Sequence, residues 1–288
     1  MPAVLRAIRI HQWCKNLLVF VPLVSSQHYD AAALAAGVAA FFAFSFAASA
    51  VYVFNDLVDL ESDRQHPAKR DRPFARGDIA VSAGIAMIPL LLAAGIAVAA
   101  ASSWRLAGVL AIYLAGTSLY SLVLKRMMLV DVIALAVFYT LRVVGGAVAI
   151  AVPVSEWLLI FCVFIFFALA IVKRYSEIAV WRETGQSQLV GRDYNVADLP
   201  ALLALAAAAA VSAIVVFALY ARSDFVRSLY ARPELLLVLC PILMFWLARL
   251  IMLAHRGALT RDPILFAFGD WVSWLTAASA AAIVLAAI

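Results

Sequence analysis

Three carboxylates follow one another at helical spacing where an apolar stretch of the chain ends. Asp56, Asp59 and Asp63 stand at positions i, i+3 and i+7 of Asn55-Asp56-Leu-Val-Asp59-Leu-Glu-Ser-Asp63. A continuing helix would turn all three to one face, with Asn55 beside Asp59. Oxygen ligands with little nitrogen or sulfur suit Mg²⁺, which binds through one or two carboxylates while substrate phosphates complete its octahedron. The spacing therefore predicts a Mg²⁺ site.

Basic residues follow directly, in His66-Pro67-Ala-Lys69-Arg70-Asp-Arg72-Pro73. Three carboxylates on one helical face repel one another unless a cation or fixed bases offset them. A phosphate group could bind both parts of this segment. Its oxygens would contact a metal held by the acidic residues on one side, and Lys69, Arg70 and Arg72 on the other. A solvated, functionless loop is the simpler alternative, but the geometry favours a diphosphate ligand.

Two further basic islands follow other apolar stretches. The first contains Tyr120 and Lys125, with Asp131 a few residues later; the second is Lys173-Arg174-Tyr-Ser-Glu177. Lys125 at a membrane edge suits an interfacial anchor as well as a ligand contact. Lys173 and Glu177 stand at i and i+4 and suit a surface ion pair as well as a phosphate clamp.

Composition shows that lipid surrounds most of this chain. Hydrophobic residues make up 67% and charged residues 14%, and the mean hydropathy is +1.02. Stretches near the ~20 residues that cross a bilayer are predicted at 31–55, 81–101, 106–124, 128–151, 156–172, 199–221, 234–254 and 264–288. A shorter run, 17–25 with its flank from residue 10, gives a ninth span, although eight remains open. The prediction is an all-α, polytopic membrane bundle of about nine helices in a single domain, 1–288.

Basic residues are distributed unevenly across nine alternating spans. One side holds 17 of the 22: Arg6, Arg9, Lys15, Arg64, Lys69, Arg70, Arg72, Arg76, Lys125, Arg126, Lys173, Arg174, Arg182, Arg192, Arg249, Arg256 and Arg261. The positive-inside rule places that side in the cytoplasm, so a multi-pass protein of the inner membrane with cytoplasmic active-site loops is expected. The net charge of +5 is then mostly a topology signal, and nucleic acid is not an expected partner. Small-residue helix faces permit homo-oligomers.

These motifs resemble the UbiA-type superfamily of intramembrane prenyltransferases over nearly the whole chain. Asn55-Asp56-x-x-Asp59-x-x-x-Asp63 matches its first acidic motif, and Tyr120-Ser-x-x-Leu-Lys125 matches the segment after its fourth helix. The second motif departs from the usual Lys-Asp-x-x-Asp, because Arg174 replaces a carboxylate. The resemblance therefore implies Mg²⁺ at the first motif, held by Asp56, Asp59 and Asp63, and no full second site.

Within the superfamily, the chain looks most like the decaprenyl-phosphate phosphoribosyltransferases. Gln12-Trp13-x-Lys15-Asn16 and the basic segment after Asp63 carry this likeness. It implies transfer of a 5-phosphoribosyl group from phosphoribosyl diphosphate to a polyprenyl phosphate. The resemblance then assigns a catalytic and metal-binding role to Asp56, Asp59 and Asp63, and substrate contacts to Lys15, Asn16, Asn55, Lys69, Arg70, Arg72, Tyr120, Lys125, Asp131, Lys173, Arg174 and Glu177.

Two alternatives stay open. The same first motif would serve a prenyltransferase that moves an isoprenyl group to an aromatic acceptor, especially if Asp193 or Asp198 rebuilt the second metal site. A transporter that couples Asp131 to Arg142 is more remote, because charge gathers on one face of this chain and not at the midplane.

Overall fold

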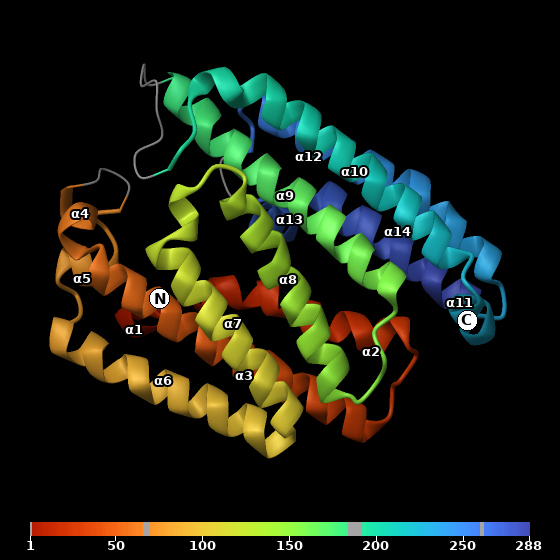
Figure 1. The fold of residues 1–288 in the computed structure, drawn as a ribbon, viewed down its shortest axis with the longest axis horizontal. Coiled ribbons are helices and arrows are strands. Elements are labelled where there is room, and N and C mark those ends of the chain that lie inside the picture. The colour runs from red at the N-terminus through yellow and green to blue at the C-terminus, as the bar shows by residue number, and fades with distance from the viewer. Residues whose placement is uncertain (1, 66–68, 184–191, 260–261) are drawn as a thin grey trace. The chain divides into compact units, whose positions relative to one another are not determined.

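The computed structural model describes residues 2–65, 69–183, 192–259 and 262–288, and its regular elements are helices (Figure 1). They are, in chain order, α1 (Ala3–Ala7), η1 (Ile10–Phe20), α2 (Val21–Ser25), α3 (Ala31–Val58), α4 (Leu60–Gln65), α5 (Pro73–Arg76), α6 (Val81–Ser102), α7 (Trp104–Leu122), η2 (Leu124–Arg126), α8 (Val130–Ala149), α9 (Glu156–Glu183), η3 (Val196–Asp198), α10 (Leu199–Ala221), α11 (Asp224–Leu229), η4 (Pro233–Val238), α12 (Leu239–His255), α13 (Pro263–Gly269) and α14 (Trp271–Ala287). The elements labelled η are 3-10 helices. The predicted all-α fold class is confirmed.

Seven of the described helices are long and apolar enough to cross a membrane. An eighth span is formed if α13 and α14, which meet at a bend of 88°, count together. These elements coincide with the eight longer predicted stretches. The shorter ninth stretch forms η1 and α2, so the count of nine spans is not confirmed.

The described contacts divide the chain into two compact units. Unit 1 comprises Met1–Leu122 and Leu141–Pro153, and unit 2 comprises Val123–Thr140 and Val154–Ile288. Helix α8 contributes its first half to unit 2 and its second half to unit 1. A single domain over 1–288 stays a prediction.

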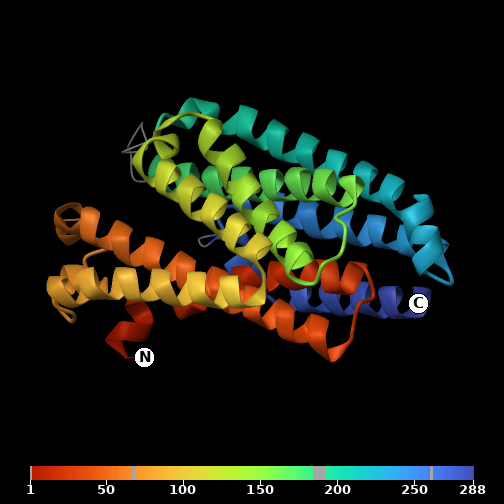
Figure 2. The same cartoon turned by 60° about the horizontal axis from the view of Figure 1, so that its bottom comes forward.

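Small residues allow close helix packing within unit 1. Helices α3 and α6 lie side by side in both views (Figures 1 and 2), and a β-carbon on Gly95 of α6 would come within 3.1 Å of the Ala43 carbonyl. Gly146 of α8 is tighter still, because a β-carbon there would lie 1.9 Å from the Val19 carbonyl oxygen of η1. Glycine therefore lets η1 pass against α8 at backbone contact distance.

In unit 2, α9 packs against α10, and α12 also contacts both helices. The α10 face carries alanines at helical spacing, and Ala206, Ala209, Ala210 and Ala213 are all buried. Because alanine side chains are small, they let the backbones of two helices approach closely. This packing holds α9, the helix that carries the second motif.

Two helices extend beyond the apolar stretches into the charged motifs. Helix α3 continues through Asn55 and Asp56 to Val58, and α9 continues through Lys173 and Glu177 to Glu183. The second motif, expected where the span gives way to a loop, is therefore helical. Intrahelical contacts such as the Arg174–Glu177 ion pair favour this continuation.

Candidate functional site

The first acidic motif lies at the junction of α3 and α4. Asp59 ends α3, but the helical bonding continues across it, since Asp59 N donates to the Asn55 carbonyl at 2.9 Å and Asp63 N donates to the Asp59 carbonyl at 2.8 Å. Asp56 and Asp63 are buried, with 2% and 1% of their surface exposed. The predicted spacing therefore turns these two carboxylates to the same place, and Asp59 and Asn55 are half-exposed next to them.

Basic side chains from two other segments converge on this pair. Arg72 Nη1, just before α5, lies 3.1 Å from Asp56 Oδ1 and 2.5 Å from Asp63 Oδ2. Arg9, between α1 and η1, donates to the same Asp56 oxygen at 2.6 Å. Its backbone adopts a left-handed conformation, and its guanidinium lies 4.8 Å from the centre of the Tyr52 ring. Asp56 is thus held by two arginines that are 47 and 16 residues away along the chain.

One oxygen of the motif has no hydrogen-bond partner among the residues that the structure describes. Asp63 Oδ1 is buried, and Lys69 Nζ lies 3.9 Å from it, which is too long for a hydrogen bond. Arg70 is exposed, and His66 and Pro67 lie outside the described residues. Among the residues that the structure describes, no three His, Cys, Asp or Glu side chains form a ready metal cluster.

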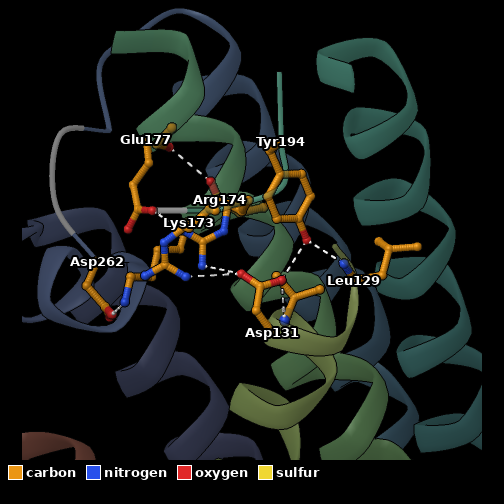
Figure 3. A network of polar contacts seen from close by, with 11 residues as sticks. Leu129, Asp131, Lys173, Arg174, Glu177, Tyr194 and Asp262 are labelled. Carbon is orange, nitrogen blue, oxygen red and sulfur yellow. Dashed lines mark hydrogen bonds and ion pairs between the residues drawn. The ribbon is translucent and has the colours of Figure 1, made fainter. Parts of the chain in front are cut away.

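The second motif forms a buried ion cluster in unit 2 (Figure 3). Arg174 of α9 is fully buried, and its Nη2 donates to Asp131 Oδ2 of α8 at 2.5 Å, while its Nη1 pairs with Glu177. Arg192 Nη1 donates to the same Asp131 oxygen at 3.2 Å. Three of the predicted substrate-binding residues therefore lie together, since Asp131 and Glu177 each pair with Arg174.

Tyr194 completes this cluster. Its hydroxyl donates to Asp131 Oδ1 at 2.6 Å and accepts from the Leu129 backbone N–H at 2.8 Å (Figure 3). Leu129 has a positive φ of 63°, a conformation that non-glycine residues rarely adopt. Burial raises the pKa of the Tyr194 phenol, and the hydrogen bond to Asp131 raises this pKa further. The neutral phenol is therefore the form that the cluster favours.

The remaining second-motif side chains contact the C-terminal part of unit 2. Lys173 Nζ lies 3.4 Å from Asp262 Oδ2 at the start of α13, and Tyr175 Oη lies 3.0 Å from His255 Nδ1 at the end of α12. Asp198, which could have supplied a second-site carboxylate, instead accepts from the Asn195 backbone N–H at 2.9 Å in the cap of η3. Asp193 is exposed.

Unit 2 also contains an apolar pocket of about 290 Å³. Its walls come from α12, α13 and α14, and Trp246, Phe268 and Trp274 contribute large apolar faces. Such a surface suits a hydrocarbon chain.

The other predicted contact residues are distributed over both units. In unit 1, Lys15 and Asn16 of η1 are buried and Tyr120 of α7 is half-buried; in unit 2, Lys125 of η2 is half-exposed. Asn16 Oδ1 accepts from Nε of Arg142 at 2.7 Å, so it lies within a polar group inside the unit.

Three functional candidates were not predicted as site residues from the sequence: Arg9, Arg142 and Tyr194. Arg142 was considered as part of an ion pair, and its position inside an apolar span was the available signal. Arg9 and Tyr194 gave no comparable signal, because their partners are 47 and 63 residues away.

The family of the chain follows from comparison with known proteins. Residues 17–274 match the model of the UbiA prenyltransferase family. The chain therefore belongs to this family, and its long apolar helices make it an integral membrane protein. A solved UbiA homolog from Archaeoglobus fulgidus, bound to GPP and Mg²⁺, has the same fold, with a TM-score of 0.75 and 19% identity over 98% of this chain and 99% of that one.

Sequence relatives differ in what is known of them. An uncharacterized protein, y4nM, of Sinorhizobium fredii is 39% identical over 95% of this chain, which spans about half (54%) of that relative's length. Nodulation protein NoeC of Azorhizobium caulinodans is 32% identical over 92% of this chain and 86% of its own length. The decaprenyl-phosphate phosphoribosyltransferase of Mycolicibacterium smegmatis is 37% identical over 63% of this chain and 58% of its own length.

Proposed function

We propose that this protein transfers a 5-phosphoribosyl group from phosphoribosyl diphosphate to a polyprenyl phosphate. The observation that carries this proposal is the 37% identity to a decaprenyl-phosphate phosphoribosyltransferase over 186 residues. The charge pattern supports it, since a donor with a diphosphate and a separate 5-phosphate needs more cationic contacts than an allylic diphosphate. Lys69, Arg70 and Arg72 provide such contacts beside the acidic motif.

The first motif fits Mg²⁺. Asp56, Asp59 and Asp63 offer only oxygen, and a cation would satisfy the buried Asp63 Oδ1, for which the described part of the chain supplies no hydrogen-bond donor. When bound, Mg²⁺ would supply electrostatic stabilisation of the diphosphate leaving group. Arg9 and Arg72, which neutralise Asp56 and Asp63 here, carry the charge that diphosphate oxygens need.

The reaction exchanges one carbon–oxygen bond for another. A phosphate oxygen of the lipid bonds to the anomeric carbon, the bond from that carbon to the diphosphate oxygen breaks, and diphosphate leaves with the electron pair. The attacking phosphate is already an anion, so no general base is required. The protein's task is then to orient both substrates and to stabilise charge.

We also propose that the site opens on the cytoplasmic side of the inner membrane, so that the donor reaches it from the cytoplasm. Most basic residues of the chain fall on the side predicted to be cytoplasmic. The acceptor tail would lie against apolar helix surfaces, of which the pocket of α12, α13 and α14 is one.

A transfer assay tests this function. Purified protein, Mg²⁺ and polyprenyl phosphate are incubated with labelled phosphoribosyl diphosphate or, separately, labelled prenyl diphosphate with aromatic acids. We expect phosphoribosylated lipid, and a loss of about 100-fold or more in Asp56→Ala, since we assign that carboxylate to the metal. Glu61→Ala, an exposed acid of the same segment, is the control. Label that moves only from the prenyl diphosphate would reject the proposed donor.

A further inference from the structure

Polar side chains of Arg9 and η1 pair with α3 in antiparallel order within unit 1. Arg9 bonds to Asp56, Trp13 Nε1 donates to Ser49 Oγ at 3.0 Å, and Asn16 Nδ2 donates to Ser45 Oγ at 3.0 Å. The α3 partners stand at helical intervals, so they form one polar stripe on an otherwise apolar helix. This stripe leads from the first acidic motif toward the middle of α3.

Arg142 of α8 lies at the inner end of the stripe. Its Nε donates to Asn16 Oδ1 at 2.7 Å, its Nη2 donates to Tyr113 Oη at 2.9 Å, and its guanidinium lies 4.9 Å from the centre of the Tyr113 ring. Only 5% of Arg142 is exposed. These contacts orient the guanidinium within the group.

A second cation lies in the same group. Lys15 directly precedes Asn16 in η1 and is 7% exposed. An ionisable side chain inside a membrane span, such as Arg142 in α8, is costly and commonly marks a substrate pathway. Two buried cations beside hydrogen-bonding side chains provide the chemistry that binds a phosphate.

We propose that Lys15, Arg142 and Tyr113 bind the phosphate group of the polyprenyl phosphate acceptor. Ser45 and Asp56 are eleven residues apart, so the site lies about 16 Å along α3 from the acidic motif. An anion with a long apolar tail is the phosphate suited to this depth, because its tail remains in lipid. This inference rests on the proposed function.

Hydrogen bonds inside unit 1 connect the two sites. Arg9 bonds to Asp56 at one end of the polar stripe, and Asn16, which bonds to Ser45 at the other end, accepts from Arg142. A donor held at the acidic motif and an acceptor phosphate held near Arg142 approach each other from the two ends of this stripe.

A binding measurement on the whole purified protein tests the inference without requiring transfer. Farnesyl phosphate is the probe, farnesol reports on the tail alone, and phosphoribosyl diphosphate with Mg²⁺ reports on the donor. We expect Arg142→Gln and Lys15→Gln to weaken farnesyl phosphate binding roughly 10- to 100-fold, the range for a lost charge-assisted hydrogen bond. Farnesol and donor binding should stay unchanged. Arg105→Gln, which removes an exposed cation of α7, is the matched control.

The outcomes separate the acceptor site from the reaction. Unchanged farnesyl phosphate binding in the folded variants, or weakening of donor binding instead, would overturn the inference. If Arg142→Gln does not fold, farnesyl phosphate binding by Lys15→Gln and Tyr113→Phe tests the inference instead. Arg142→Lys should keep part of the affinity that Arg142→Gln loses. Charge-dependent lipid binding without phosphoribosyl transfer would reject the proposed function and leave this site standing.

Discussion

Asp131 is the residue on which the ion cluster of unit 2 depends. It is fully buried and accepts from Arg174, Arg192 and Tyr194. Asp131→Asn removes the charge that compensates the buried Arg174, so we expect a loss of stability of about 3 kcal/mol or more. Thermal unfolding in detergent measures this loss. Asp193→Asn, at an exposed carboxylate nearby, should unfold like the parent, and equal unfolding temperatures for both variants would contradict the role of Asp131.

Tyr194 gives this cluster a pH dependence. Because its pKa is raised in the folded state, the neutral phenol stabilises the fold fully below its ordinary pKa of about 10, and this contribution falls as pH rises through the folded pKa. Tyr194→Phe should cost about 2 kcal/mol at neutral pH, since it leaves Leu129 N–H and Asp131 each short of a partner.

Denaturation of both proteins from pH 7 to pH 11 measures the difference. We expect a constant gap up to about pH 10 and a narrowing gap above it. A gap that widens with rising pH would show that the phenolate, and not the phenol, is the stabilising form. Tyr29→Phe, at an exposed tyrosine, is the control.

Residue-scale prediction from sequence worked where partners are close along the chain. The helical spacing of Asp56, Asp59 and Asp63 predicted one face for all three carboxylates. Arg72 contacts Asp56 and Asp63, while Asp59 caps the end of α3 and is half-exposed. The Arg9 contact depends on tertiary packing, so no local pattern could reveal it. Arg174 was expected to reach a phosphate, and in the structure its described bonds go to Asp131 and Glu177. Its substrate contact stays a prediction.

At the scale of elements, the apolar stretches predicted the positions of the long helices but not the residues at which these helices end. Hydropathy falls at Asn55 and at Lys173, yet α3 and α9 continue because backbone hydrogen bonds and intrahelical pairs do not require apolar residues. Segment 10–25 is different. Its polar residues pair with the α3 stripe, and it forms η1 and α2, which no periodicity argument anticipated.

Gly146 tests the close approach between α8 and η1. A β-carbon there would lie 1.9 Å from the Val19 carbonyl oxygen, and a backbone atom cannot move aside as a flexible side chain can. Gly146→Ala should therefore cost about 3 kcal/mol, at the upper end of overpacking effects. Gly108→Ala is the matched control, since nothing lies within 4 Å of its β-carbon position and alanine favours a helix interior.

Yield of folded protein and unfolding temperature distinguish these two variants. Gly108→Ala should equal or exceed the parent, while Gly146→Ala falls well below it. If Gly146→Ala were as stable as Gly108→Ala, the contact distance between η1 and α8 would be wrong.

At the scale of the whole molecule, composition predicted the fold class because lipid imposes a strong constraint. A spanning chain must satisfy its backbone hydrogen bonds internally, so long apolar stretches become helices. The family match and the Archaeoglobus fold agree with that prediction. The number of spans was less predictable, since the ninth stretch forms η1 and α2 and since α13 and α14 meet at a bend of 88°.

Orientation in the membrane is the remaining prediction at this scale. The positive-inside rule assigns the segment after α3 to the cytoplasm and the segment around α11 to the opposite side. After replacement of Cys14, Cys162 and Cys240 by serine, Ser62→Cys and Ser228→Cys place single thiols at exposed positions of α4 and α11. A membrane-impermeant maleimide should label Ser228→Cys in spheroplasts and Ser62→Cys only after the membrane is opened. Inverted vesicles should give the reverse pattern. Labelling of Ser62→Cys in intact spheroplasts would place the first acidic motif outside the cytoplasm, where a cytoplasmic phosphoribosyl diphosphate could not reach Asp56.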